Sequence, residues 1–277
     1  MKKKIWLAAG ICLILAGMIC AVVAISRYRA EANAGKIYED IKQEVNALTP
    51  ESVTVEESVQ VSETLPEEIM EESIEESTEE VEEPVEIPID FASLTAQYPD
   101  IYAWIHIPGT DIDYPIVQRE GDNAYYLNHT IDGKKKTEGA IFTEDYNTKD
   151  FTDPNTLIYG HNMKNGSMFR GLHKFKDRKF MEENAEVIIY MPDKILHYKI
   201  FAAYVNDNRH LLFLYDFDDP EVFESYIEDV LGRKSMSSNI DNTIEINAED
   251  KIITLSTCNG NDNQRYLVQA VLLSIEE

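Results

Sequence analysis

A cysteine and an arginine flank a short polar connection near the C-terminus, in the stretch KIITLSTCNGNDNQRYLVQAVLL (251–273). Apolar, β-branched runs on both sides of the connection predict two strands, so Cys258 ends the first strand and Arg265 begins the second. A thiol beside a fixed guanidinium can attack a carbonyl carbon while the cation stabilises the negative charge that develops. The alternative is a small residue that packs in the core and an arginine on the surface.

The use of cysteine favours a reactive thiol at Cys258. The other two cysteines, Cys12 and Cys20, lie in an apolar N-terminal segment. No second cysteine is therefore near enough to form a zinc or redox pair with Cys258. We find no compact cluster of acidic residues that predicts a metal site, and we expect no cofactor.

A thiol nucleophile needs an acid or base beside it, and His161 has the most suitable position. The run TLIY (156–159) predicts a buried strand that Gly160 breaks, so His161 also lies at a strand end. The pairing with Cys258 is an inference from position, since the sequence does not show that the two strand ends meet. The other histidines lack a comparable setting, namely His106, His129, His173, His197 and His210.

The elements that must position these residues are mostly strands. About eight strands and two or three short helices fit a closed or nearly closed β-barrel with helices inserted in its connections. Ahead of the final pair we expect strands at 104–107, 114–118, 139–143, 156–159, 186–191 and 195–205, a strand or an extended link at 239–246, and helices at 91–98, after a cap at Ser167, and from Asp219 to Gly232.

The N-terminus has the pattern of a membrane anchor. Residues 5–25 carry no charged side chain and are numerous enough to span a bilayer as a helix. The basic residues at 2–4 favour an N-terminus inside the cell and the bulk of the chain outside it. A signal peptide cleaved at the small residues 32–34 is the alternative.

Most of the net charge of −26 lies in one low-complexity segment. Residues 51–90 contain 16 acidic and no basic side chains, with no aromatic residue before Phe91. Such a segment cannot bury enough apolar surface to fold, which predicts a disordered stalk; an acidic interaction tail is the alternative. Residues 36–48 have the pattern of a short amphipathic helix above the membrane. No basic stripe occurs, which argues against nucleic acid as a partner.

These patterns divide the chain into three parts. We expect residues 1–30 to form a cytoplasmic lysine cluster and a transmembrane signal-anchor, 31–88 a juxtamembrane segment with the stalk, and 89–277 the folded domain. The protein is then expected in the cell membrane as a single-pass protein.

The motif TLSTC at 254–258, with Arg265 after it and YGHN at 159–162 before it, resembles the sortase family of cysteine transpeptidases. The resemblance covers nearly all of 91–277 and extends to the order of anchor, stalk and C-terminal domain. It implies an eight-stranded sortase β-barrel. Class B is favoured by Ser256, and by further stretches at 104–118, 122–129 and 208–236.

The resemblance assigns a role to each residue of the site. Cys258 would be the nucleophile that attacks the carbonyl after the threonine of a C-terminal sorting signal. His161 would protonate the leaving amine and then deprotonate the incoming one. Arg265 would stabilise the oxyanion.

Five further residues match positions that line the peptide groove in similar enzymes: Asn123, Leu127, Tyr226, Ile227 and Ser256. Tyr226 and Ile227 would lie on the inserted helix. The alternative is structural, with Leu127 and Ile227 in the core and Asn123 in a turn.

The resulting hypothesis is an enzyme that joins surface proteins to a peptidoglycan amine through a thioester, with sorting signals of the NPxTx type expected. Three alternatives stay open. A pilin polymerase would use a lysine of another pilin as acceptor, a thiol protease would use water, and a membrane-tethered binding module would have no activity.

Overall fold

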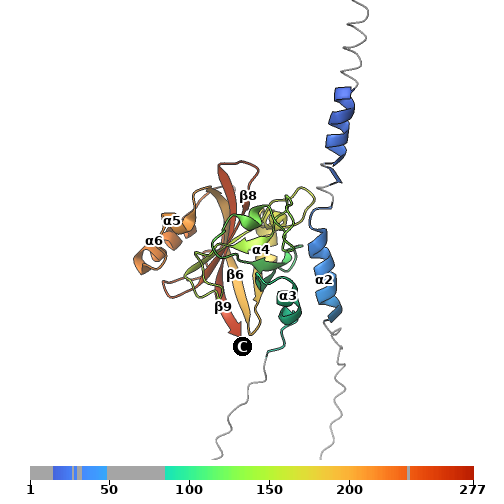
Figure 1. Cartoon of the computed structure of the whole chain (residues 1–277). Coiled ribbons are helices and arrows are strands. Elements are labelled where there is room, and N and C mark those ends of the chain that lie inside the picture. Colours follow the sequence, from blue (N-terminus) through green and yellow to red (C-terminus); the bar gives the residue numbers. More distant parts are fainter. Residues whose placement is uncertain (1–14, 27, 30–32, 49–84, 236–237) are drawn as a thin grey trace, which may run out of the picture.

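The computed structural model describes residues 15–26, 28–29, 33–48, 85–235 and 238–277 (Figure 1). Most of the acidic segment, at 49–84, lies outside these residues, so its predicted disorder stays a prediction. The first part of the expected anchor, at 5–14, also lies outside them. Among the helices that the structure describes, none is both long and apolar enough to cross a membrane.

The catalytic domain is a closed β-barrel, as predicted. Its strands follow the order β5-β1-β2-β3-β4-β8-β9-β6, and β6 pairs with β5 to close the ring of eight. The bounds are β1 (Ile101–His106), β2 (Asp113–Val117), β3 (Ile141–Thr143), β4 (Asn155–Tyr159), β5 (Glu186–Tyr190), β6 (Ile195–Asp207), β8 (Ile252–Cys258) and β9 (Gln264–Glu276).

The segment 239–246, expected as a strand or an extended link, forms only a short strand in the structure. Only β7 (Asn239–Ile240) pairs, and it joins β6 outside the ring. The Asp241 carboxylate accepts hydrogen bonds from the amide and hydroxyl of Thr243. This local turn ends the strand, because it competes with the ladder for the backbone.

Strand β8 lies in the middle of the barrel wall and is buried along its whole length up to Cys258. It pairs in parallel with β4 and antiparallel with β9. Its apolar, β-branched sequence suits a strand that is covered on both faces. The parallel pairing places the C-terminal ends of β4 and β8 on the same rim.

Of the helices after residue 85, the first precedes β1, and the others occupy the connections between strands. They are α3 (Phe91–Gln97), η1 (Tyr125–Leu127), η2 (Phe169–Lys176), α4 (Arg178–Glu183), α5 (Leu211–Leu214) and α6 (Pro220–Leu231). Asp219 caps α6 as predicted, accepting a hydrogen bond from the Glu221 amide. The cap expected at Ser167 is wrong. Ser167 bonds to the Asn165 side chain, and the next helix, η2, is a 3₁₀ helix with Met168 at its N-cap and no side-chain cap.

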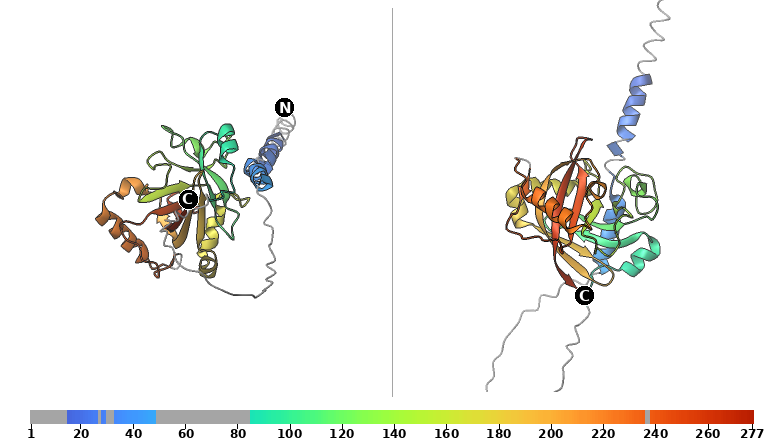
Figure 2. Two further views of the ribbon diagram at one scale, coloured as in Figure 1. Left: turned by 90° about the horizontal axis from the view of Figure 1, so that it is seen from below. Right: turned by 90° about the vertical axis from the view of Figure 1, so that its left-hand side faces the viewer.

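Helix α2 (Lys36–Leu48) belongs to the folded domain, which the sequence did not predict. The predicted helix exists, but it packs on the barrel. Figures 1 and 2 show it on the opposite side of the barrel from α5 and α6. Tyr38 is fully buried, its hydroxyl donates to the Gly139 carbonyl at 2.5 Å, and its ring meets that of Tyr114 edge-on. The boundary expected at residue 89 therefore leaves out an element of the domain.

We predict that Tyr38→Ala lowers the free energy of unfolding by about 3–5 kcal/mol, because it removes a buried aromatic ring and leaves a cavity. Urea denaturation of protein beginning at residue 33, followed by the fluorescence of buried Trp104, measures this. Glu39→Ala is the control, since the Glu39 side chain is 61% exposed on the same helix and should change stability by less than about 0.5 kcal/mol. Equal stability of the two variants would mean that α2 does not dock.

Candidate active site

Cys258 and Arg265 face each other across the last pair of strands. Cys258 ends β8, and its register partner on β9 is Arg265. The Cys258 side chain is exposed, so its thiol is open to an incoming molecule. The guanidinium of Arg265 donates to the carbonyls of Asp262 and Gln264, at 3.3 and 3.0 Å. These contacts hold the cation at the strand mouth beside the thiol, as the sequence predicted.

The strand ends that carry His161 and Cys258 do meet. Tyr159 is the register partner of Ser256 in the β4–β8 pair. Beyond it, the Gly160 amide donates to the Ser256 carbonyl at 3.1 Å, and the Thr257 hydroxyl donates to the Gly160 carbonyl at 2.7 Å. His161 follows directly and lies beside Cys258.

Gly160 is required by a close approach at this point. A Cβ there would lie 2.5 Å from Ile141 and 2.6 Å from the ring of Phe169. Both neighbours are fully buried, so neither side chain has room to move away. The glycine lets β4 pass between them and deliver His161 to the rim.

A backbone carbonyl fixes the orientation of the His161 ring. Its Nε2 lies 2.7 Å from the carbonyl oxygen of Leu127. A carbonyl only accepts, so Nε2 carries the hydrogen and Nδ1 is left to exchange a proton with the Cys258 thiol. Leu127 thus orients the base through its main chain.

The two ionisable groups shift each other in opposite directions. The hydrogen bond from His161 lowers the pKa of the Cys258 thiol; burial opposes this, and the charge of Arg265 lowers the pKa further. The contact with Cys258 in turn raises the pKa of His161, although burial of the ring opposes that shift. Both directions favour a thiolate beside an imidazolium, the reactive form of such a pair.

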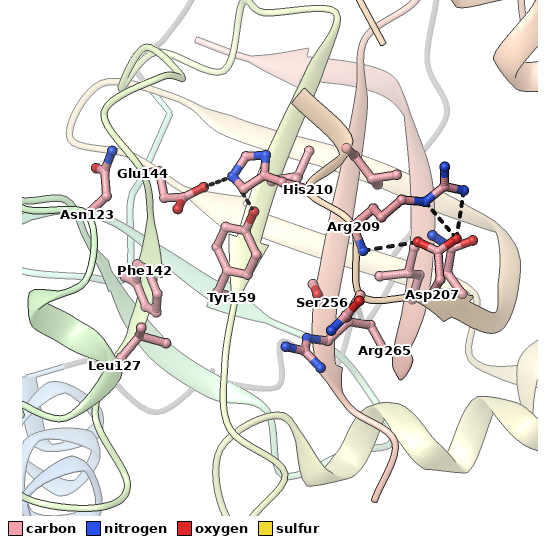
Figure 3. Close-up of a pocket in the computed structure, with 15 residues that line it drawn as sticks. Asn123, Leu127, Phe142, Glu144, Tyr159, Asp207, Arg209, His210, Ser256 and Arg265 are labelled. Atoms are coloured by element: carbon pink, nitrogen blue, oxygen red, sulfur yellow. Dashed lines mark hydrogen bonds and ion pairs between the residues drawn. The ribbon is translucent and has the colours of Figure 1, made fainter. Parts of the chain in front are cut away.

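A groove of about 220 Å³ begins at Arg265 and runs along the barrel wall (Figure 3). One side is formed by β3, β4 and η1, and the other by the segment after β6. Both polar and apolar side chains line it. The lining includes Asn123, Leu127, Phe142, Glu144, Tyr159, Arg209, His210, Ser256 and Arg265.

Three of the five expected groove residues line it. The Leu127 side chain is 46% exposed there, and Ser256 points to the same face of β8 as Cys258 because it lies two residues earlier. Asn123 lines the groove while its amide exchanges hydrogen bonds with Asp145, donating to the carboxylate at 2.6 Å and accepting from the amide at 2.7 Å.

The placement of Tyr226 and Ile227 in the groove is wrong. Both lie on the face of α6 that packs on the barrel, and they are 2% and 3% exposed. The hydroxyl of Tyr226 accepts a hydrogen bond from the buried Gln269 side chain at 2.7 Å. The two residues therefore stabilise the inserted helix and do not reach a peptide.

Sequence reasoning missed a polar cluster in the groove. His210 Nε2 lies 2.5 Å from the Glu144 carboxylate and 3.3 Å from the Tyr159 hydroxyl (Figure 3). The His210 ring also stacks on Phe213. No sequence pattern predicts this cluster, because Glu144 and His210 are 66 residues apart in the chain.

The comparisons with known proteins agree with this geometry. Residues 105–273 match the family model of the sortase domain. The chain belongs to the sortase family. Sortase B of Listeria monocytogenes is 35% identical over 178 residues, which cover 63% of this chain and 70% of the relative. This sortase is therefore a cysteine transpeptidase, and its similarities favour class B as the sequence motifs did.

Solved structures give the same answer. Sortase B from B. anthracis has a TM-score of 0.60 and 30% identity, covering 70% of this sortase and 88% of that chain. A Streptococcus pyogenes class B sortase involved in pilus biogenesis has a TM-score of 0.57 and 28% identity, covering 66% of this chain and 98% of that one.

We predict that His161→Ala moves the pH profile of Cys258 alkylation to higher pH. The thiolate is the form that reacts, and its pKa in the folded protein is lowered chiefly by His161. Alkylation therefore begins at a lower pH in the native sortase, where the pKa of the Cys258 thiol is lowered, than in the variant, where that pKa is higher. Iodoacetamide labelling followed by mass spectrometry measures the profile, with His106→Gln on β1 as the control. An unchanged profile in His161→Ala would contradict the assigned contact.

Proposed function

We propose that this sortase cleaves a C-terminal sorting signal after threonine and transfers the surface protein to a peptidoglycan amine. The observation that carries the proposal is the meeting of Cys258, His161 and Arg265 at one strand mouth, beside a groove that can hold an extended peptide. Family membership supports the reaction type, and the arrangement supports the role of each residue.

The acylation half of the reaction follows from this arrangement. The thiolate of Cys258 attacks the carbonyl carbon of the threonine, and the charge on its oxygen develops near the guanidinium of Arg265. The carbon–nitrogen bond then breaks, and His161 gives its proton to the leaving amine. The product is a thioester between Cys258 and the surface protein.

Deacylation uses the same groups in the opposite direction. The nitrogen of the incoming amine attacks the thioester carbonyl, and His161, which is now neutral, takes a proton from that amine. The carbon–sulfur bond breaks, Cys258 leaves as the thiolate, and a new amide forms. Water in place of the amine would yield hydrolysis, which is the thiol-protease alternative.

We propose a sorting signal of the NPxTx type. The groove is lined by Glu144 and His210 as well as by Leu127 and Phe142. A carboxylate and an imidazole can accept from and donate to a side-chain amide such as that of asparagine. A leucine side chain at the same position could not exchange hydrogen bonds with these two groups.

We also propose that residues 5–25 anchor the sortase in the cell membrane, with the N-terminus in the cytoplasm and the catalytic domain outside. The uncharged stretch and the basic residues before it support this. The helical residues 15–26 expose Leu15, Met18, Ile19 and Val22 to their surroundings, which suits contact with lipid.

Pilin polymerisation is a second candidate, favoured by the similarity to the S. pyogenes class B sortase involved in pilus biogenesis. The chemistry at Cys258 is the same, and only the acceptor differs. An assay with an oligoglycine or diaminopimelate-type amine and with a lysine-containing pilin peptide separates the two.

Cys258→Ala should abolish cleavage of sorting peptides, a loss on the order of 10⁴-fold or more in kcat. Arg265→Lys should reduce kcat about 10²–10³-fold, because a single ammonium does not replace the fork that stabilises the oxyanion. Mass spectrometry of the Cys258 adduct and of the products measures both steps. Arg178→Lys on α4 is the matched control. Cleavage that persists in Cys258→Ala would show that the nucleophile is misassigned.

Glu144→Gln should raise KM for an NPxTx peptide about tenfold and leave kcat nearly unchanged, because it weakens hydrogen bonds of a charged acceptor in the groove and keeps its shape. Steady-state kinetics on NPxTx and LPxTG peptides measure the effect, with Glu221→Gln on the surface of α6 as the control. An equal change for both peptides would indicate that Glu144 does not read the first residue of the signal.

A further inference from the structure

The backbone carbonyl of the nucleophile accepts two side-chain hydrogen bonds. Asn162 Nδ2 donates to the Cys258 carbonyl at 2.8 Å, and His173 Nε2 lies 3.2 Å from the same oxygen. Both donors come from the segment that follows β4. The ladder between β4 and β8 ends at Ser256, so this carbonyl lies beyond its last register pair. The two side chains take the place of a strand partner.

The amide of Asn162 is held in the orientation that this contact needs. Its Oδ1 accepts from Arg170 Nη1 at 3.0 Å, which leaves Nδ2 to face Cys258. Asn162 also forms an isolated bridge with Met168, and the Phe169 amide donates to the His161 carbonyl at 2.9 Å. The loop that carries His161 is thereby folded back on itself and fastened to the end of β8.

His173 is built as a neutral donor. The carbonyl of Cys258 only accepts, so Nε2 carries the hydrogen. Its Nδ1 is buried and has no hydrogen-bond partner among the described residues. The ring stacks on Tyr266 of β9, with centroids 4.8 Å apart. A second proton would bury a positive charge near Lys176 and Arg170 of the same helix, and burial, together with these cations, lowers the pKa of His173.

We propose that Asn162 and His173 are positioning residues, which hold the backbone of Cys258 so that its thiol stays against His161. Asn162 is the direct neighbour of the base in the chain, so one hydrogen bond couples the base to the nucleophile. A displacement of about 1 Å between reacting groups can reduce a rate about 10²-fold. The exposed end of a strand, next to a turn, is where such a displacement is easiest.

The test combines two readouts on the full chain, with Cys12 and Cys20 replaced by serine so that only Cys258 reports. The first is the pH profile of alkylation by iodoacetamide, which needs no peptide substrate. The second is kcat and KM for transpeptidation. Asn162→Ala should move the alkylation profile to higher pH and lower kcat about 10- to 100-fold, with KM changed less than about threefold.

Paired substitutions separate positioning from packing at His173. His173→Phe keeps a ring on Tyr266 and loses the donor, whereas His173→Gln keeps a donor and loses the ring. We expect His173→Phe to lower kcat and His173→Gln to retain most of it. The groups that face the His173 ring are Arg170, Lys176, Tyr266 and Cys258. We expect the pH profile of Cys258 alkylation to show no additional inflection from titration of His173.

The control is Asn239→Ala, which removes a hydrogen bond of the same kind, from Nδ2 to the Phe175 carbonyl at 2.7 Å. It should lower the melting temperature without changing the alkylation profile. A native profile and kcat in Asn162→Ala would overturn the proposal, and so would equal losses in His173→Phe and His173→Gln. Because alkylation involves no peptide, the alkylation profile tests the proposal independently of the sorting signal, and a native profile in Asn162→Ala would count against the proposal whatever peptide the sortase cleaves.

Discussion

The parallel pairing of β4 with β8 is the constraint on which the active site depends. Parallel neighbours place the same ends of two strands at one rim of a sheet, whereas antiparallel neighbours place opposite ends there. Most pairs in this barrel are antiparallel, and this parallel pair brings the base to the nucleophile. The antiparallel pairing of β8 with β9 then returns the chain to the same rim and delivers Arg265. Closure of the ring by β5 and β6 leaves these strands little freedom to separate.

The positions of Cys258, His161 and Arg265 were predictable because each stands beside an apolar run that predicts a strand. The groove was less predictable, since it is lined by residues far apart in the chain, such as Glu144 and His210. Motif similarity also misplaced Tyr226 and Ile227. Their spacing from Phe223 and Val230 puts all four on one face of α6, the face that the structure buries against the barrel. Helical periodicity decided their place, and sequence similarity did not.

The packing of α2 on the barrel could not be predicted from the sequence for a different reason. An amphipathic pattern predicts that one face of a helix is covered, and it does not say by what. Residues 36–48 precede an acidic, low-complexity segment, so their apolar face had no evident partner nearby in the chain. The partner proved to be distant. Tyr38 contacts Gly139 and Tyr114, and Lys42 donates to the Asp111 carbonyl at 3.2 Å.

Leu127 belongs to two parts of the site at once. Its carbonyl holds the His161 ring, and its side chain lines the groove. The same short helix, η1, therefore forms part of the groove wall and sets the tautomer of His161. A change in this helix that alters the groove also alters proton transfer, so the two properties are not free to vary separately.

The packing of α2 on the barrel places both ends of the acidic segment on the same domain. A chain that leaves a domain and returns to the same domain is a closed loop, and its ends stay where the domain holds them. Residues 49–84 begin after α2 and end before α3, both of which pack on the barrel. The length of this segment therefore does not determine how far the active site lies from the helical residues 15–26, because the chain between that helix and α2 is only residues 27–35.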